Sequence, residues 1–467
     1  MTRNSAPIII VALSVVLAVL LPHPAFAQSA GSSTATDSDI AASSSQSQLD
    51  ELSTSRRVPG NHVTVLDHGP SAFRTWREVI SQARSSIYLQ TYYLEDEGMC
   101  SQLIDILKSK ASQGVKVAII ITRYSQMGKA PLTYLEIKKA GIDVILVGSI
   151  GFPKEIPTGR SSWFDRMKED ERIFRSLPRE APFRQWFDKE KGGELMVDFA
   201  LHEKMLVVDG TTAIIGGRNL SDCYFFWWQD LDVAIEGPIV TEIARAFERN
   251  WYEFGGHPLP QSTPLQQPPF NDGISVRLTQ SRPWHGGYHN LDMLCGAIDM
   301  AKERVCISSQ YLALPPKLRQ VLIDAAGRGV DVRILTNSME TGREVNLSLC
   351  HFISLNYYDD LLRAGVGIYE YQSPPGLKLR PYFHAKQFII DGKYLAIGSF
   401  NLSIRSSYLE SEIMLSLVDP VFAGIQEKKF LQELEGKTSR ISRDILAAEE
   451  KHHHLLMEMA KRLEILY

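Results

Sequence analysis

Short apolar runs alternate with amphipathic stretches along this chain, and the same alternation occurs in two separate parts of it. One run, QGVKVAIIIT, spans residues 113–122, and a second, RGVDVRILTN, spans residues 328–337. Runs with few polar positions predict strands that are covered on both faces. A further helix and strand are predicted after each run, over 134–147 and 357–371. Strands that alternate with helices in this way predict an α/β sheet.

The two parts also resemble each other ahead of these runs. The first part reads AxxSIYLQTYYLEDEG and the second reads AKERVCISSQYLALPP, each followed by an amphipathic stretch and a glycine turn. Such an internal repeat predicts a duplicated fold. We therefore predict an α/β protein of two similar lobes, each a β-sheet flanked by helices.

Composition shifts divide the chain into six segments. Residues 28–57 are rich in Ser, Thr, Asp and Gln and predict a disordered tether, and Pro and Gln at 255–273 predict a linker. The predicted lobes then span 58–254 and 274–420, and a helix-forming tail spans 421–467. An insert at about 152–198 mixes aromatic and charged residues. It is interpreted either as an amphipathic flap that touches lipid or as a salt-bridged surface insertion.

The N-terminus has the pattern of an export signal. Arg3 precedes the apolar run Ile8–Leu21, and Ala25-Phe26-Ala27 gives a small-x-small cleavage pattern. The run is shorter than the roughly 20 residues that span a bilayer. We predict a signal peptide over residues 1–27 and a periplasmic or secreted protein, peripheral at the membrane. An uncleaved anchor is the alternative.

Charge and cysteine content exclude some classes of function. The formal net charge is -4, so no global basic field attracts nucleic acid, which makes nucleic acid an unfavoured partner. The five cysteines match no metal spacing. The run His452–His454 lies in a predicted helix, where adjacent side chains point in different directions, so it is interpreted as a solvated face. No metal and no cofactor are predicted.

One motif occurs twice, without a gap between the copies. HEKMLVVDGTTAIIGGRN runs from His202 to Asn219, and HAKQFIIDGKYLAIGSFN runs from His384 to Asn401. Residues two apart on a strand share a face, so each His is expected beside the Lys two positions on. The Asp-Gly pairs predict hairpin turns. Each copy thus offers an imidazole, an ammonium and an amide at one end of a sheet.

A phosphodiester requires this combination of groups. Ammonium and amide donors hold the anion and stabilise the extra charge of the transition state. One imidazole can act as nucleophile and a second as acid for the leaving alkoxide, which explains why the motif is present twice. The sequence gives the candidate catalytic residues His202, Lys204, Asp209, His384, Lys386 and Asp391.

These residues resemble the pattern H-x-K-x4-D-x6-G-S-x-N of the phospholipase D superfamily. The second copy fits every position, and the first has Gly217 in place of Ser, with the apparent loss of one hydroxyl near the phosphate. The resemblance covers about residues 62–420. It implies mixed sheets in two phospholipase D-like lobes, with the active site at their interface.

The resemblance also implies roles for individual residues. One His attacks phosphorus to form a phosphohistidine and the other protonates the leaving alcohol; by analogy His202 is the nucleophile and His384 the acid. A carboxylate eleven positions after each motif Asn is expected to orient a catalytic ring, which points to Asp230 and Glu412. Asp209 and Asp391 then fit turn-holding roles better than catalytic ones. The implied phosphate-binding residues are Lys204, Asn219, Lys386, Ser399 and Asn401.

Further strings resemble the cardiolipin-synthase-like bacterial branch. These are GGRNLSDCYFFW, QDLDVAIEGPIV, LTNS and SFNLSIRS. The resemblance implies a phospholipid substrate at a membrane surface, with water, another alcohol or phosphatidylglycerol as acceptor. The aromatic residues 225–228 fit either an acyl-chain channel or plain core. Two alternatives are an exported nuclease with the same dyad and a catalytically silent membrane-binding protein. An accessory protein is neither indicated nor excluded.

Overall fold

The structure is a computed structural model that describes residues 39–122, 130–147, 200–259, 268–344, 348–372 and 382–464. Four predictions fall wholly or partly outside these ranges. The signal peptide and the insert at 152–198 lie outside the described residues, as do the first part of the tether and most of the proline-rich part of the linker.

The first lobe is built on seven strands in the order β1-β8-β7-β6-β2-β3-β4. The pairs β2–β3 and β3–β4 are parallel and the other four neighbouring pairs are antiparallel, so the sheet is mixed. The strands are β1 (Val58–Leu66), β2 (Ser86–Thr91), β3 (Lys116–Thr122), β4 (Asp143–Val147), β6 (Met205–Val208), β7 (Thr212–Gly216) and β8 (Asp232–Glu236).

The second lobe repeats this order as β9-β17-β15-β14-β10-β12-β13, with β18 added at its outer edge. Its strands are β9 (Ile274–Ser281), β10 (Arg304–Ser308), β12 (Asp331–Asn337), β13 (Gly367–Tyr371), β14 (Gln387–Ile390), β15 (Tyr394–Gly398), β17 (Glu410–Val418) and β18 (Thr438–Arg440). The short strands β11 (Leu312–Ala313) and β16 (Leu402–Ser403) pair with each other. The predicted α/β fold of two similar lobes is confirmed.

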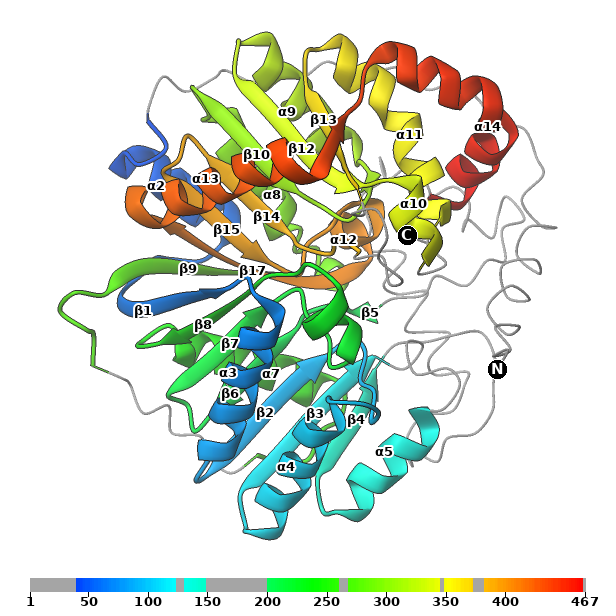
Figure 1. The fold of residues 1–467 in the computed structure, drawn as a ribbon. Coiled ribbons are helices and arrows are strands. Elements are labelled where there is room, and N and C mark those ends of the chain that lie inside the picture. The colour runs from blue at the N-terminus through cyan, green and yellow to red at the C-terminus, as the bar shows by residue number, and fades with distance from the viewer. Residues whose placement is uncertain are drawn as a thin grey trace, which may run out of the picture.

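The two sheets join along their first strands, which the sequence did not predict. Strand β1 pairs antiparallel with β9, so the strands of both lobes form one continuous path. A second link is the short strand β5 (Ala200–Leu201), which precedes His202 and pairs parallel with β17 of the other lobe. Figure 1 shows the two lobes stacked on either side of this junction.

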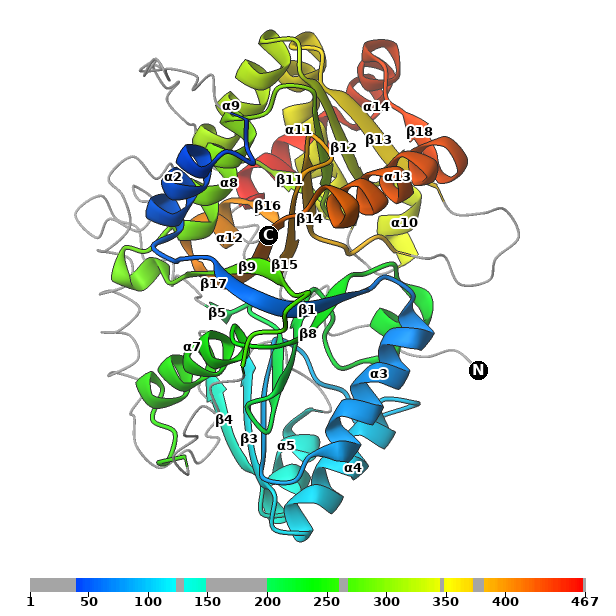
Figure 2. The ribbon, with the colours of Figure 1, turned by 90° about the vertical axis from the view of Figure 1, so that its left-hand side faces the viewer.

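Helices cover both faces of each sheet (Figures 1 and 2). In the first lobe these are α3 (Gly69–Gln82), α4 (Ser101–Ser112), α5 (Ala130–Lys139) and α7 (Val240–Glu253), with the π-helical turn η4 (Cys223–Trp227). In the second they are α8 (His289–Asp299), α9 (Pro316–Gly327), α10 (Met339–Glu344), α11 (Ser348–Arg363) and α12 (Ile404–Tyr408), with the 3-10 turn η5 (Pro283–His285). One hydrophobic cluster contains residues of both lobes, including Phe247 of α7 and Phe430 of the tail. The lobes therefore share part of their core.

Part of the predicted disordered tether is folded. Helix α2 (Ser43–Ser53) packs on α8 and buries Leu49 completely. Arg277 of β9 is almost fully buried, and its guanidinium donates to Asp50 Oδ1 at 2.5 and 2.9 Å and to the backbone oxygen of Gln46 at 3.1 Å. A buried guanidinium needs such acceptors. The prediction of disorder up to residue 57 was wrong because tertiary contacts outweigh the polar composition.

The tail is helical but is not a separate appendage. It consists of α13 (Pro420–Lys437), the strand β18, and α14 (Arg443–Leu463). Residues Leu446, Met457 and Ala460 of α14 are buried in the core of the second lobe. His452 and His454 are exposed and His453 is half-buried.

The described residues contain no helix with the length and apolar character needed to cross a membrane. All five cysteines are free thiols, and burial raises the pKa of each.

Candidate active site

The two motif histidines meet where the lobes join, and each is held by the backbone of the opposite lobe. The His202 N–H donates to the Ser411 carbonyl at 3.0 Å, and the His384 N–H donates to the Gln229 carbonyl at 2.7 Å. Ser411 and Gln229 immediately precede the two predicted orienting carboxylates. The duplication therefore places each histidine beside the carboxylate segment of the other lobe.

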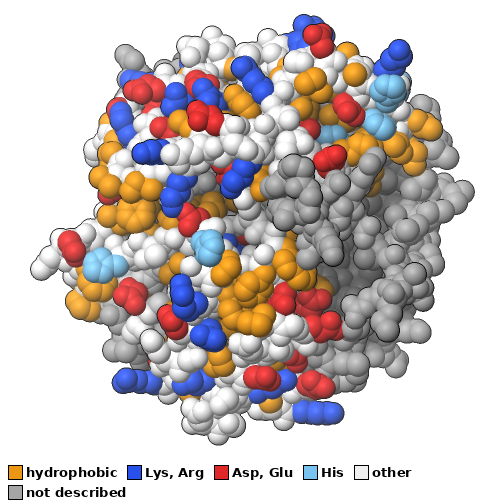
Figure 3. Space-filling view, in the orientation of Figure 1, with side chains coloured by type: hydrophobic (Ala, Val, Ile, Leu, Met, Phe, Trp, Pro, Cys, Tyr) orange, Lys and Arg blue, Asp and Glu red, His pale blue; other side chains and the backbone are white. Residues whose placement is uncertain are grey.

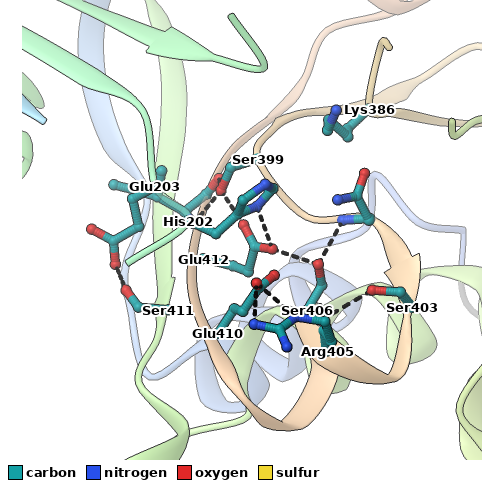
Figure 4. A network of polar contacts seen from close by, with 12 residues as sticks. His202, Glu203, Lys386, Ser399, Ser403, Arg405, Ser406, Glu410, Ser411 and Glu412 are labelled. Atoms are coloured by element: carbon teal, nitrogen blue, oxygen red, sulfur yellow. Dashed lines mark hydrogen bonds and ion pairs between the residues drawn. The ribbon is translucent and has the colours of Figure 1, made fainter. Parts of the chain in front are cut away.

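The carboxylates cross over between the lobes. Glu412 Oε1 of the second lobe lies 2.9 Å from His202 Nδ1 of the first (Figure 4), and Asp230 Oδ2 of the first lies 2.6 Å from His384 Nδ1 of the second. A carboxylate at Nδ1 favours the tautomer with the proton on that nitrogen and leaves Nε2 unprotonated. Both carboxylates are essentially fully buried, and the histidines are only 7 % and 5 % exposed.

The two lysines point at the same centre. Lys204 Nζ donates to the His202 carbonyl at 2.5 Å and lies 5.2 Å from the centre of the Tyr92 ring. Lys386 Nζ lies 2.8 and 3.1 Å from the two ring nitrogens of His384. Two buried ammonium groups at one place form a site that attracts an anion.

Burial sets the protonation states of these groups. It holds the pKa of His202 and of His384 well below the ordinary value, and the neighbouring Lys204 and Lys386 act in the same direction. It also lowers the pKa of Lys204 to about 8 and that of Lys386 to about 7. The imidazoles are therefore neutral near pH 7, which is the form that a nucleophile requires.

The motif asparagines are buried at the same centre. Asn219 Oδ1 accepts from the backbone N–H of Tyr93 at 3.2 Å and from Thr91 Oγ1 at 3.4 Å, which fixes the side-chain amide. Asn401 Oδ1 is buried and has no hydrogen-bond partner within the described part of the chain. Both amides are 2 % exposed.

Ser399 serves the carboxylate rather than the phosphate. Its hydroxyl donates to Glu412 Oε2 (Figure 4), and its Oγ accepts from the Ile413 N–H at 2.9 Å. At the matching position, a Cβ on Gly217 would come within 2.1 Å of Asp230 Oδ1. The glycine thus makes room for Asp230, and the interpretation of Gly217 as a hydroxyl missing beside the phosphate was wrong.

Asp209 and Asp391 lie at the far ends of their strands from the histidines. Asp209 accepts from the backbone N–H groups of residues 84–86, and Asp391 from those of residues 302–304, at 2.7–3.0 Å. Each has φ of 53°, in the left-handed region that an Asp-Gly turn uses. They tie the hairpin turns to the starts of β2 and β10, so their inclusion among the catalytic residues is corrected to a structural role.

One group of described side chains has ligand atoms close enough together for a metal ion. His202, Glu410 and Glu412 have such atoms within 4.8 Å of one another. Glu410 accepts from the Arg405 guanidinium at 2.9 Å, and Glu412 accepts from Ser399 and Ser406 in addition to His202 (Figure 4). Protein donors already bond these oxygens, so the arrangement fits a hydrogen-bonded network that orients the His202 ring better than a metal site.

The aromatic run 225–228 divides between core and site, so neither interpretation holds for all of it. Phe225 is buried against Trp76 and Phe73, whereas Trp227 is 46 % exposed. Trp228, which directly follows the π-helical turn η4, lies 5.6 Å from the His384 ring, and Tyr224 of that turn meets the ring edge-on at 5.0 Å. π-Helical turns of this kind occur frequently at functional sites.

Sequence reasoning missed Glu203, which lies between His202 and Lys204. Its carboxylate is fully buried and accepts from Asn250 at 2.6 Å, Gln90 at 3.0 Å, Gln280 at 2.9 Å and Ser411. Two of these donors belong to each lobe, so Glu203 clamps the lobes together directly behind the histidine. The available signal was a carboxylate between the His and the Lys of the first motif, at the position where the second motif has Ala385.

Arg218 was also missed. This almost fully buried guanidinium donates to the carbonyls of Leu66 at 2.8 Å, Tyr224 at 3.1 Å and Asp230 at 2.5 Å. It also pairs with Asp232 at 3.2 Å. Arg218 therefore fixes the segment that presents Asp230 to the other lobe.

Two repeated α/β lobes that bring two histidine–lysine pairs to one buried centre define a phosphodiesterase of the phospholipase D type. A family model described as "Cardiolipin synthase, PLD-like domain" matches residues 76–251 and 294–434. The chain belongs to this cardiolipin-synthase-like family of the phospholipase D superfamily, as the sequence predicted.

Named relatives agree with this assignment, and one solved structure shares the fold. The chain is 28% identical over 414 residues to cardiolipin synthase A of Pseudomonas fluorescens strain SBW25, covering 87% of this chain and 74% of that protein. It is 27% identical over 421 residues to cardiolipin synthase A of Pseudomonas putida strain GB-1, covering 89% and 76%. The crystal structure of phosphatidylserine synthase from Haemophilus influenzae Rd KW20 has a TM-score of 0.62 at 12% identity, covering 90% of this chain and 99% of that one. This last likeness shows the fold alone.

The Glu203 clamp predicts a measurable effect of Glu203→Gln. The amide brings an NH2 group against four donors, and leaving buried donors unsatisfied costs about 1–3 kcal/mol. We expect the free energy of unfolding to fall by that amount. We also expect kcat to fall by roughly tenfold or more, because the hydrogen-bonded network that positions His202 is disrupted. Denaturant unfolding and steady-state kinetics measure both. Glu236→Gln, on an exposed strand end, is the matched control, and native kcat in Glu203→Gln would contradict a positioning role.

Proposed function

We propose that this protein transfers a phosphatidyl group from one phospholipid to the hydroxyl of a second, with phosphatidylglycerol as acceptor and cardiolipin as product. The observation that carries the proposal is the crossed pair of imidazole–carboxylate contacts with two buried lysines beside them. This set supplies a nucleophile, an acid and a cationic phosphate cradle together. The names of the curated relatives support a phospholipid substrate.

In the first half-reaction, His202 Nε2 attacks phosphorus and the bond from phosphorus to the leaving alcohol oxygen breaks. The negative charge of the bound phosphodiester favours the imidazolium form of His384, which gives its Nε2 proton to that oxygen and becomes neutral, and a phosphatidyl group remains on His202 as a phosphohistidine. Lys204 and Lys386 stabilise the charge that develops on the phosphoryl oxygens. Glu412 stabilises the positive charge on the His202 ring while the new P–N bond exists.

In the second half-reaction the roles reverse at His384. Its unprotonated Nε2 takes the proton from the acceptor hydroxyl, the acceptor oxygen attacks phosphorus, and the P–N bond breaks to release His202. The nearly complete burial of both rings favours an alcohol delivered with a lipid over bulk water. Water as acceptor gives phosphatidic acid.

The first test is turnover of phosphatidylglycerol vesicles by the native protein, His202→Ala and His384→Ala. We expect cardiolipin and glycerol from the native protein and a loss of at least about a hundredfold in each variant, because each ring carries a separate chemical role. Plasmid DNA is the parallel substrate. Figure 3 shows Lys and Arg interspersed with Asp and Glu over the described part of this face, which does not favour DNA. His-dependent DNA nicking without a lipid product would contradict the proposal.

The same two variants also separate the nucleophile from the acid. A phosphatidyl ester of p-nitrophenol has a leaving group that needs no acid, so His384→Ala should release one equivalent of nitrophenolate and then stall as a phosphohistidine. His202→Ala should release none. Stopped-flow absorbance and intact-protein mass spectrometry follow both events, and the reverse pattern would exchange the two roles.

The pH dependence follows from the lysine pKa values. Each lysine must be protonated to hold the phosphate, and the pKa values of about 7 and about 8 mean that charge is lost as pH rises through that range. We expect kcat/KM to fall above roughly pH 7–8. The kcat profile should fall at higher pH, because a bound phosphodiester stabilises the ammonium groups. If kcat and kcat/KM fell over the same alkaline pH range, the lysines would be excluded as the groups that titrate.

Export is part of the proposal, and the apolar segment 8–21 followed by Ala25-Phe26-Ala27 supports it. N-terminal mass spectrometry of protein expressed in a bacterial host should give Gln28 as the first residue of material released from the periplasm. Recovery of the full-length chain from the membrane fraction would instead favour the uncleaved anchor.

A further inference from the structure

A pocket of about 500 Å³ lies between the lobes, where α2 ends and α7 passes β9. Figure 2 shows α2 and α7 on the same side of the molecule, one on each side of the central strands. Its charged and titratable lining residues are Arg56, Arg249, Arg282, His285, His289 and Glu242. Ser53, Thr54 and Ser55, at the end of α2, also line it.

The lining is strongly cationic in a protein whose net charge is -4. Its one carboxylate, Glu242, already accepts from Arg245 at 2.6 Å. Glu253, which is not part of the lining, pairs with Arg282 and His285. Arg56 and Arg249 have no ion pair with any residue that the structure describes. The positive charge of the pocket is thus incompletely compensated by the described protein groups.

Arg249 and Arg282 are close enough to affect each other. Burial lowers the pKa of Arg282, and the charge of Arg249 lowers it further, while Glu203 opposes both effects. Two guanidinium groups held together in this way gain stability from an anion placed between them.

The pocket and the histidines lie on opposite faces of β17. Alternate residues of a strand point to opposite faces. Glu412 faces His202, whereas Ser411 faces Glu203. Gln280 of the pocket is paired with Ile413 across the two strands, and Ile413 points to the same face of β17 as Ser411. On that face Gln280 donates a hydrogen bond to Glu203. The pocket is therefore separate from the catalytic centre.

A hydrogen-bonded chain nevertheless connects the two. Arg249 donates to Gln280 Oε1 at 2.8 and 3.2 Å, Gln280 Nε2 donates to Glu203 at 2.9 Å, and Glu203 adjoins His202 in the chain. A ligand that draws Arg249 toward itself acts directly on Gln280 and so on the clamp behind His202.

We propose that this pocket is a second anion site, which binds a phosphate group by its arginines. The shared chemistry is a phosphate oxyanion, supplied either by the headgroup of a phospholipid or by free phosphate. Guanidinium groups suit such a ligand because they donate two parallel hydrogen bonds to it.

Calorimetric titration of the full chain with inorganic phosphate tests the proposal. The native protein should bind two equivalents, one in the catalytic centre and one in the pocket. The double variant Arg56→Gln/Arg249→Gln should still bind phosphate in the catalytic centre, but its pocket should bind phosphate about tenfold or more weakly. Both side chains are exposed enough for the change to leave the fold intact, and thermal unfolding verifies this. Arg74→Gln with Arg84→Gln, on an exposed part of the first lobe, is the control with the same loss of charge.

A second arm identifies the source of the phosphate. Sedimentation with phosphatidylcholine vesicles that contain phosphatidylglycerol is compared for the native protein, the pocket variant and the control variant. A pocket-specific loss of vesicle binding assigns the site to a lipid headgroup, and a loss of phosphate binding alone assigns it to free phosphate. Unchanged binding of both probes in the pocket variant overturns the proposal. These readouts do not require turnover, so they are independent of the proposed transferase activity.

Discussion

Each catalytic ring of this protein depends on a carboxylate that the other lobe supplies. The contacts His202–Glu412 and His384–Asp230 cross the junction in both directions, and the backbone bonds from the histidines to Ser411 and Gln229 cross it beside them. Neither lobe alone can fix the tautomer of its own histidine. The shared core, the pairing of β1 with β9, and the Glu203 clamp all follow from the need to hold these two crossings in register.

The second constraint is the burial of so much charge at one place. Burial raises the pKa of Glu412 to about 7 and also raises that of Asp230, while it lowers the pKa of both lysines. Each shift favours the neutral form, which is the general response of ionisable groups to a site of low dielectric. A phosphodiester anion restores the balance by stabilising the ammonium groups. The centre is therefore suited to a negative ligand, because such a ligand favours the charged form of both lysines.

The sequence predicted the duplicated α/β fold and the residues that converge because two ungapped motifs fix spacing along each strand. It did not predict which carboxylate meets which histidine, since that depends on how two lobes dock and not on spacing within either. It also placed Ser399 on the phosphate, although the hydroxyl bonds Glu412. Helix α2 was missed because its stability comes from Arg277 and α8, more than 200 positions away, and local composition carries no trace of such contacts.

The two halves share one plan but are not equivalent, and the differences compensate one another. The second half has the longer Glu412, whose extra methylene brings its carboxylate within reach of the Ser399 hydroxyl. The first half has the shorter Asp230, which occupies the space where the Cβ of a serine at Gly217 would lie. Glu203 has four donors around it, whereas Ala385 is simply buried. The two histidines therefore stand in unlike environments, although each keeps a carboxylate of the other lobe at Nδ1.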